Sequence, residues 1–304
     1  MSWAAHDLEP YAIQHHFGKR IAFVPLLAGS YAPDLLSKWF VYGISVAGIE
    51  LKADNPAQFH RGWPGFGFTH SLTFGVVLGL LLYALTKRPV IAYSFVIGQW
   101  AHCLTDIGDT VGVMLFFPFT THLYAVGAWA YAGQAGRQVD AGAYFSGLGF
   151  VWDGFWLVVV LISWRVLTRT YFREKVVQAD PFWGWAGKSL SETFLFTVYV
   201  AAFFYGTCRW VAWLIWAHVV RAFPFDLSWG GPGWAPRTTN DELNEAASCG
   251  CPSCRAASGT MAMYGFVAVA AWVRHPRRRS LRKVFGDAPR PRRRRSRWRR
   301  RRHA

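Results

Sequence analysis

The long apolar segments of this chain restrict its possible folds more than any other feature. A transmembrane helix needs roughly 17–25 mostly apolar residues. Segments of about that length are Ser71–Thr86, Val90–Cys103, Phe145–Trp164, Phe194–Val220 and Ser258–Val273. Only 16% of the residues are charged, compared with about 25% in a typical soluble domain. We therefore expect an all-α, polytopic membrane protein with about five or six transmembrane helices.

Four further apolar segments are too short to cross a bilayer alone. Pro33 and Asp34 separate Ile21–Ala32 from Trp39–Ile49, which predicts a break between them. Val111–Phe117 and Leu123–Tyr131 are shorter still and fit re-entrant or interfacial positions.

Basic residues predict the orientation, because they favour the cytoplasmic side of a membrane. Lys87 with Arg88, the loop Arg165–Lys188 and the C-terminal tail are all basic. Alternating spans put all three on one side. We expect a multi-pass protein of the inner (plasma) membrane with a cytoplasmic C-terminus. Its parts are a helical membrane domain at 1–222, an extracytoplasmic loop at 223–257, a last span at 258–273 and a disordered polybasic tail at 274–304.

The tail carries most of the net charge of +16, because Arg274–His303 holds 16 of the 33 basic residues and one acid. Membrane lipids are therefore the expected partners, with anionic headgroups at the tail. Nucleic acid is an alternative through the same phosphate electrostatics. We favour the simplest role for the tail, a disordered anchor of the topology that any anionic surface would attract. The sequence leaves the oligomeric state open.

The basic pair Lys87-Arg88 also predicts where two histidines meet. His70 precedes Lys87 by 17 residues and His102 follows Arg88 by 14. These separations are about 25 Å and 21 Å along helices that rise about 1.5 Å per residue. Two antiparallel helices joined at this pair would bring both histidines to similar depths near the outer face.

The N-terminal segment repeats the arrangement around Gly18–Arg20. If this tripeptide is a turn, His6 lies 12 residues before it and Asp34 lies 14 residues after it. A helical hairpin would place His6 beside Asp34, level with His70 and His102. Ionisable groups beside apolar segments are costly unless they have a function or a partner.

These residues resemble, in their order, the bacterial membrane-bound metal-dependent hydrolases. That family is distantly similar to zinc-dependent phospholipases C and related nucleases. The similarity covers roughly the first 120 residues and rests on Ala28–Asp34, His60-Arg61-Gly62, Thr69-His70-Ser71, His102 with Asp106, and Gly112–Pro118. Ala101 stands where the family usually has serine, and Trp63–Gly67 lengthens the gap between two of the motifs.

The resemblance and the residue types together predict a metal site. The candidate ligands are His6, Asp34, His60, His70, His102 and Asp106. His and Asp ligands suit Zn²⁺ first, with Mn²⁺ or Fe²⁺ as alternatives. Six candidates exceed four tetrahedral positions, so either two ions bind or some residues support the others. His15 and His16 are alternatives to His6.

Other polar residues near these motifs have predicted roles of their own. Arg61 could pair with a phosphate, and Asp109 and His122, which flank the His102–Asp106 motif, could join the catalytic site. Ser71 fits a helix N-cap better than a nucleophile. Asp153 and Glu192 are predicted to make polar contacts between helices, whereas Arg209 and His218 could reach lipid headgroups.

The function expected from these features is hydrolysis by a metal-activated water, on phosphoester or lipid-related substrates. Two alternatives remain at this point. The His/Asp cluster could be structural in a non-enzymatic membrane protein, or it could line the ion path of a transporter. Cys249, Cys251 and Cys254 are compatible with a disulfide plus one free thiol, or with zinc.

Overall fold

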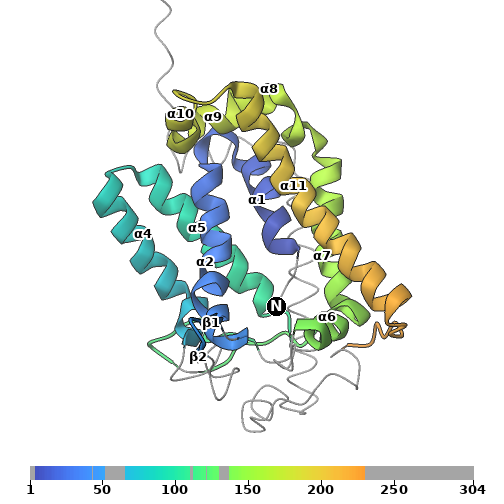
Figure 1. Cartoon of the computed structure of the whole chain (residues 1–304). Coiled ribbons are helices and arrows are strands. Elements are labelled where there is room, and N and C mark those ends of the chain that lie inside the picture. The colour runs from blue at the N-terminus through green and yellow to red at the C-terminus, as the bar shows by residue number, and fades with distance from the viewer. Residues whose placement is uncertain are drawn as a thin grey trace, which may run out of the picture. The chain divides into compact units, whose positions relative to one another are not determined.

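The computed structural model describes residues 4–42, 44–51, 66–109, 112–120, 122–129 and 137–229, and these are mostly helical (Figure 1). They belong to the first of two compact units, which covers residues 1–264. The predicted last span, the tail and the three clustered cysteines lie outside the described residues, as does most of the predicted extracytoplasmic loop.

The predicted N-terminal helical hairpin is confirmed. Helix α1 (Ala5–Phe17) is followed by the short η1 (Gly18–Arg20) and by α2 (Phe23–Tyr42). The break predicted at Pro33 is wrong, because this residue lies inside α2. A proline weakens a helix by removing one hydrogen bond. Extensive packing of α2 on α5 (Pro89–Asp106) offsets that loss.

The second predicted hairpin is also confirmed. A short helix, η2 (Phe66–His70), leads into α4 (Leu72–Thr86), and α5 returns alongside it. Ser71 caps α4 by accepting a 3.2 Å hydrogen bond from the Phe74 N–H, as its N-cap interpretation predicted. Lys87 reverses the chain in a left-handed conformation, with φ of 55°.

Two glycines allow α2 and α5 to touch through their backbones. A Cβ atom added to Gly98 would lie 2.0 Å from the carbonyl oxygen of Leu26. One added to Gly29 would lie 2.1 Å from that of Phe95. Any larger side chain at these positions would push the helices apart. Small residues allow such close helix contacts in membrane proteins.

The second half of the structure differs from expectation in two places. Phe145–Trp164, predicted as one span, contains the end of α6 (Arg137–Ser146) and all of α7 (Leu148–Ile162). The predicted loop Arg165–Lys188 is largely helical. It comprises most of η3 (Trp164–Leu167), then α8 (Arg169–Tyr171), η4 (Phe172–Val176), α9 (Val177–Ala179) and α10 (Pro181–Ala186).

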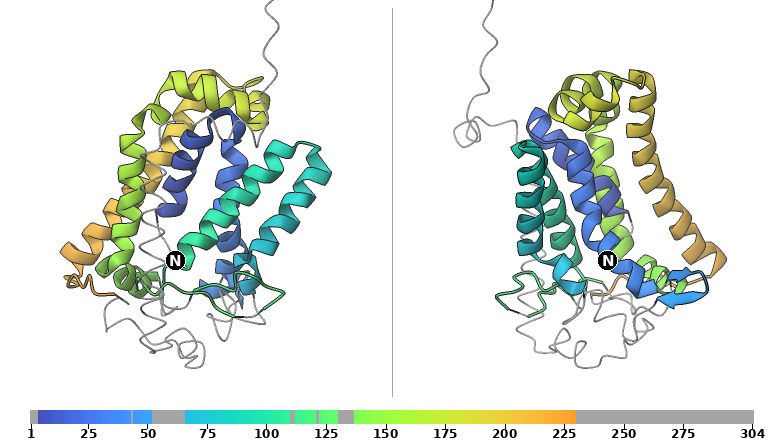
Figure 2. Two further views of the ribbon diagram at one scale, coloured as in Figure 1. Left: turned by 180° about the vertical axis from the view of Figure 1, so that it is seen from behind. Right: turned by 60° about the vertical axis from the view of Figure 1, so that its left-hand side comes forward.

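The long helix α11 (Glu192–Ile215), extended by η5 (Trp216–Val220), packs on α1 and α7. Figure 2 shows the two N-terminal hairpins side by side, with α7 and α11 on the flank of α1. Buried aromatic side chains, including Tyr11, Phe172 and Tyr199, fill the core between these elements. This core fixes α1, and therefore His6, against the later helices.

Two short strands and a non-helical segment lie beside the hairpins. Strands β1 (Ile44–Val46) and β2 (Ile49–Leu51) pair antiparallel, so the apolar segment Trp39–Ile49 is divided between the end of α2 and this hairpin. Ala47 and Gly48 both have positive φ, which suits a tight two-residue turn. Residues 112–129, where described, are extended or turn and bridge at Val113 and Tyr124.

Among the described residues, one helix is long and apolar enough to cross a membrane. It is Glu192–Val220, with a mean hydropathy of 1.4, and only 17% of its most apolar window is buried. Leu72–Thr86 and Leu148–Ile162 are shorter apolar helices. The described part of the chain thus contains one candidate span of the five or six expected.

Asp153 holds the beginning of α1. Its carboxylate accepts 2.9 Å hydrogen bonds from the N–H groups of Ala4 and Ala5, and a 3.1 Å bond from the Tyr144 hydroxyl. The predicted contact between helices is therefore confirmed. We expect Asp153→Ala to lower the free energy of unfolding by about 1–3 kcal/mol, because buried N–H groups lose their acceptor. Thermal unfolding in detergent measures this.

Glu192→Ala is the matched control for that variant. The Glu192 carboxylate also lies at a helix start, but it is exposed and pairs with Arg169 at 3.1 Å. Exposed ion pairs contribute about 0–1 kcal/mol. Equal losses for the two variants would show that Asp153 does not anchor α1.

Candidate metal centre

Four buried side chains converge where the two hairpins meet. Asp34 comes from α2, His70 from the end of η2, and His102 and Asp106 from successive turns of α5. One ligand atom from each lies within 4.8 Å of the others. These are four of the six ligands predicted from the sequence, and the arrangement could hold a metal ion.

The spacing of the ligand atoms fits a shared ion better than direct hydrogen bonds. The Nε2 atoms of His70 and His102 each lie 3.5 Å from Oδ2 of Asp106. They lie 3.7 Å and 3.9 Å from Oδ1 of Asp34. Hydrogen bonds between such groups are about 2.7–3.2 Å long. Ligands about 2.1 Å from a tetrahedral ion are about 3.4 Å apart.

A hydrogen bond at Nδ1 orients the ring of His102. Its Nδ1 lies 2.6 Å from the carbonyl oxygen of Ser30. A carbonyl oxygen only accepts hydrogen bonds, so Nδ1 carries the proton. In the neutral ring, Nε2 then directs a lone pair at the two carboxylates. Metal-bound histidines are commonly held in this way.

His70 is oriented by a short relay through Thr69. The Thr69 hydroxyl donates to the Pro33 carbonyl at 3.2 Å and lies 3.1 Å from Nδ1 of His70. Because its proton is directed at Pro33, the hydroxyl accepts the proton of Nδ1. Nε2 of His70 therefore also faces the carboxylates as a lone pair. Four acceptors facing one another repel unless a cation lies between them.

His6 lies against this group but outside it. Its ring stacks on that of His102, with centroids 3.8 Å apart, and its Nε2 is 3.5 Å from Oδ1 of Asp106. Neither ring nitrogen has a hydrogen-bond partner among the described residues. His6 thus approaches Oδ1 of Asp106, whereas His70 and His102 approach Oδ2. The sequence predicted that His6 would lie near the other candidate ligands. Its role as a ligand stays a prediction.

The remaining predicted site residues are less central. His60 and Arg61 lie outside the described residues. Asp109 is buried, and its Oδ1 accepts a 2.6 Å hydrogen bond from the Gly112 N–H. It is not one of the four clustered residues, and its catalytic role stays a prediction. His122 is exposed and packs edge-on against Tyr124.

Sequence reasoning missed the residues that orient the site. Ser30 contributes a main-chain carbonyl, which no residue type signals. Gln99 was detectable, because it is an amide within an apolar helix. It donates 3.0 Å and 2.9 Å hydrogen bonds to the carbonyls of Thr69 and Ser71, on either side of His70. Glu9 is also buried and accepts a hydrogen bond from Thr105.

The two residues predicted to reach headgroups have partners within the protein. Nη2 of Arg209 lies 2.8 Å from Oδ2 of the buried Asp7, which provides a closer partner than lipid. The ring nitrogens of His218 lie 2.9 Å and 2.8 Å from the carbonyls of Phe223 and Phe145. Arg209 therefore connects α11 to α1, and His218 connects η5 to α6.

Comparisons of the chain with protein-family models, with curated proteins and with solved structures returned no match. The resemblance to membrane-bound metal-dependent hydrolases stays an expectation that rests on motif residues. The cluster itself depends only on the geometry described above.

Proposed function

We propose that the chain is an integral membrane protein that binds a divalent metal ion through Asp34, His70, His102 and Asp106. One observation carries this proposal. Two histidines, each with Nδ1 bound to an acceptor, direct Nε2 at two buried carboxylates across 3.5–3.9 Å. A shared cation would offset the repulsion among these groups.

The proposed activity is hydrolysis of a phosphoester or a lipid-related substrate. Mixed nitrogen and oxygen ligands favour Zn²⁺, with Mn²⁺ or Fe²⁺ as alternatives. Bound there, such an ion would lower the pKa of a water and so supply the nucleophile. His6 and His60 would complete the site or hold a second ion. Arg61 would pair with a phosphate, and Asp109 would accept or donate a proton.

The outward faces of three helices support placement in a membrane. Exposed large apolar side chains there are Val76, Val77, Leu80, Leu81 and Leu85 on α4, Val158, Leu161 and Ile162 on α7, and Phe194, Val198, Phe204, Val211 and Ile215 on α11. Apolar surfaces of this extent are unusual in a monomeric soluble protein. We propose a multi-pass arrangement in the plasma membrane, with the basic turns on the cytoplasmic side.

The metal content of the purified protein tests the site directly. We expect elemental analysis to find a bound divalent ion in the unmodified chain, and His70→Ala and His102→Ala each to remove it. His122→Ala is the matched control, because this exposed histidine lies outside the cluster. Unchanged metal in both cluster variants would show that the ion, if present, binds elsewhere.

Activity measurements separate hydrolysis from the alternatives. Metal-dependent cleavage of phosphoesters or phospholipids, lost in His102→Ala, would support the enzyme. Bound metal without cleavage in such a panel would favour a non-enzymatic role. Metal-dependent uptake into vesicles would favour a transporter, in which the same groups line an ion path.

A further inference from the structure

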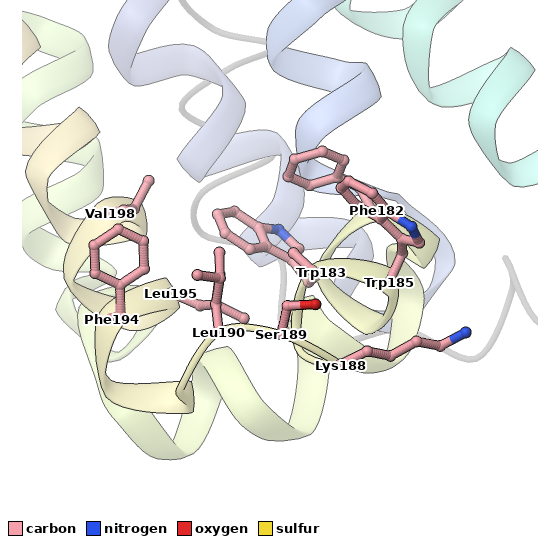
Figure 3. A pocket seen from close by; sticks show the side chains of 10 residues that line it. Phe182, Trp183, Trp185, Lys188, Ser189, Leu190, Phe194, Leu195 and Val198 are labelled. Atoms are coloured by element: carbon pink, nitrogen blue, oxygen red, sulfur yellow. The ribbon is translucent and has the colours of Figure 1, made fainter.

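A second site lies where α10 meets the beginning of α11. A pocket of about 310 Å³ opens there (Figure 3). Its walls are mainly apolar and include Phe182, Trp185, Leu190, Phe194 and Val198. All five side chains are largely accessible. The pocket therefore offers a hydrophobic recess that remains open at the surface.

A charged group accompanies these walls. Lys188 lines the pocket and is exposed, and no carboxylate among the described residues pairs with it. Trp183 also lines the pocket, but its indole nitrogen is buried within the wall and is not accessible to a ligand. A ligand with an apolar chain and a negative charge would complement the apolar walls and Lys188.

The surroundings of the pocket are basic. Arg173 and Lys175 lie on η4, which precedes it, and Lys19 of η1 hydrogen-bonds to Gln178 of α9. Arg169 does not add to this charge, because it pairs with Glu192. The hydroxyl of Tyr93, in the first turns of α5, hydrogen-bonds to the Arg20 carbonyl. The α1–α2 and α4–α5 turns therefore lie at the same end as α10 (Figure 1). Such a surface attracts anionic headgroups.

We propose that this pocket binds an anionic phospholipid. One acyl chain lies along the apolar walls, and the phosphate lies near Lys188. The pocket is formed partly by the first two turns of α11, the helix long enough to span a membrane. If α11 spans the membrane, these turns lie at headgroup level. The proposal rests on the membrane placement proposed above, and it is independent of the metal ion.

Photo-crosslinking with the full chain in phosphatidylcholine liposomes tests this binding. The probe is phosphatidylglycerol with a diazirine on one acyl chain, and phosphatidylcholine with the same diazirine is the comparison. We expect the phosphatidylglycerol probe to label residues 181–198 preferentially. Lys188→Gln should reduce that labelling about fivefold, equivalent to about 1 kcal/mol for one charge near an anionic surface. Phe194→Ala should also reduce it.

Two matched variants distinguish the pocket from general attraction. Lys87→Gln removes a charge at the α4–α5 turn, and Phe204→Ala removes an exposed aromatic ring elsewhere on α11. Neither should change labelling of residues 181–198. Equal effects of all four variants, or equal labelling by both probes, would overturn the proposal. Metal content of the same preparations reports separately on the metal site.

Discussion

Gly98→Ala is expected to lower the free energy of unfolding by about 3 kcal/mol, at the upper end of the usual cost of overpacking. The new Cβ would lie 2.0 Å from the Leu26 carbonyl oxygen and 3.0 Å from the Ser30 backbone nitrogen. Both contacts are with backbone, so no side chain can rotate away. Thermal unfolding of the detergent-solubilised protein, followed by size-exclusion chromatography, measures the loss.

The same substitution should weaken metal binding. The Ser30 carbonyl that accepts the His102 Nδ1–H bond at 2.6 Å lies on α2, opposite Gly98. Moving α5 away from α2 would lengthen this bond and release the ring. Gly184→Ala is the control, since a Cβ there meets nothing within 4 Å. A Gly98 variant as stable as the Gly184 variant would contradict the close contact of α2 and α5.

Asp106→Asn is expected to reduce metal affinity by more than about 100-fold, beyond the 10–100-fold cost of losing an outer-shell partner. Asp106 is the common neighbour of His6, His70 and His102, at 3.5 Å from each Nε2. The amide keeps the size of the side chain but removes its charge. Metal titration of the stripped protein measures the change, and metal-dependent hydrolysis should fall to background.

Two measurements separate this loss of metal from unfolding. Without metal, Asp106→Asn should be at least as stable as the unmodified chain, because one of two nearby carboxylates loses its charge. Asp109→Asn should retain the metal, since that carboxylate binds the Gly112 N–H outside the cluster. Loss of metal in the Asp109 variant as well would place the ion closer to Gly112 than proposed.

The two helical hairpins could be predicted because basic residues mark their turns and the segments on either side are long enough to form helices. Lys87-Arg88 and Gly18–Arg20 interrupt apolar segments, and both positions are the turns between helices in the structure. Similar separations from the turn, 17 and 14 residues, then bring His70 to His102, whose ring centroids are 5.1 Å apart. The same count placed His6 beside Asp34, whereas in the structure its ring stacks on that of His102. Convergence of the ligands therefore followed from simple helix geometry.

Other features depended on tertiary contacts that residue types do not show. Pro33 indicated a break, yet packing on α5 keeps α2 continuous. The Ser30 carbonyl orients His102, but every residue has a carbonyl. Arg209 indicated a surface role, and its partner Asp7 lies about 200 positions away in the chain. Such pairings arise only once α11 packs on α1.

The position of the cluster in the first two hairpins has a consequence for the order of events during synthesis. Asp34, His70, His102 and Asp106 all precede α6, α7 and α11 in the chain. A nascent chain that has just completed α5 already contains all four. Acquisition of an ion can therefore come before translation of the second half. The later helices would then dock onto a preformed centre, with Arg209 meeting Asp7 as a closing step.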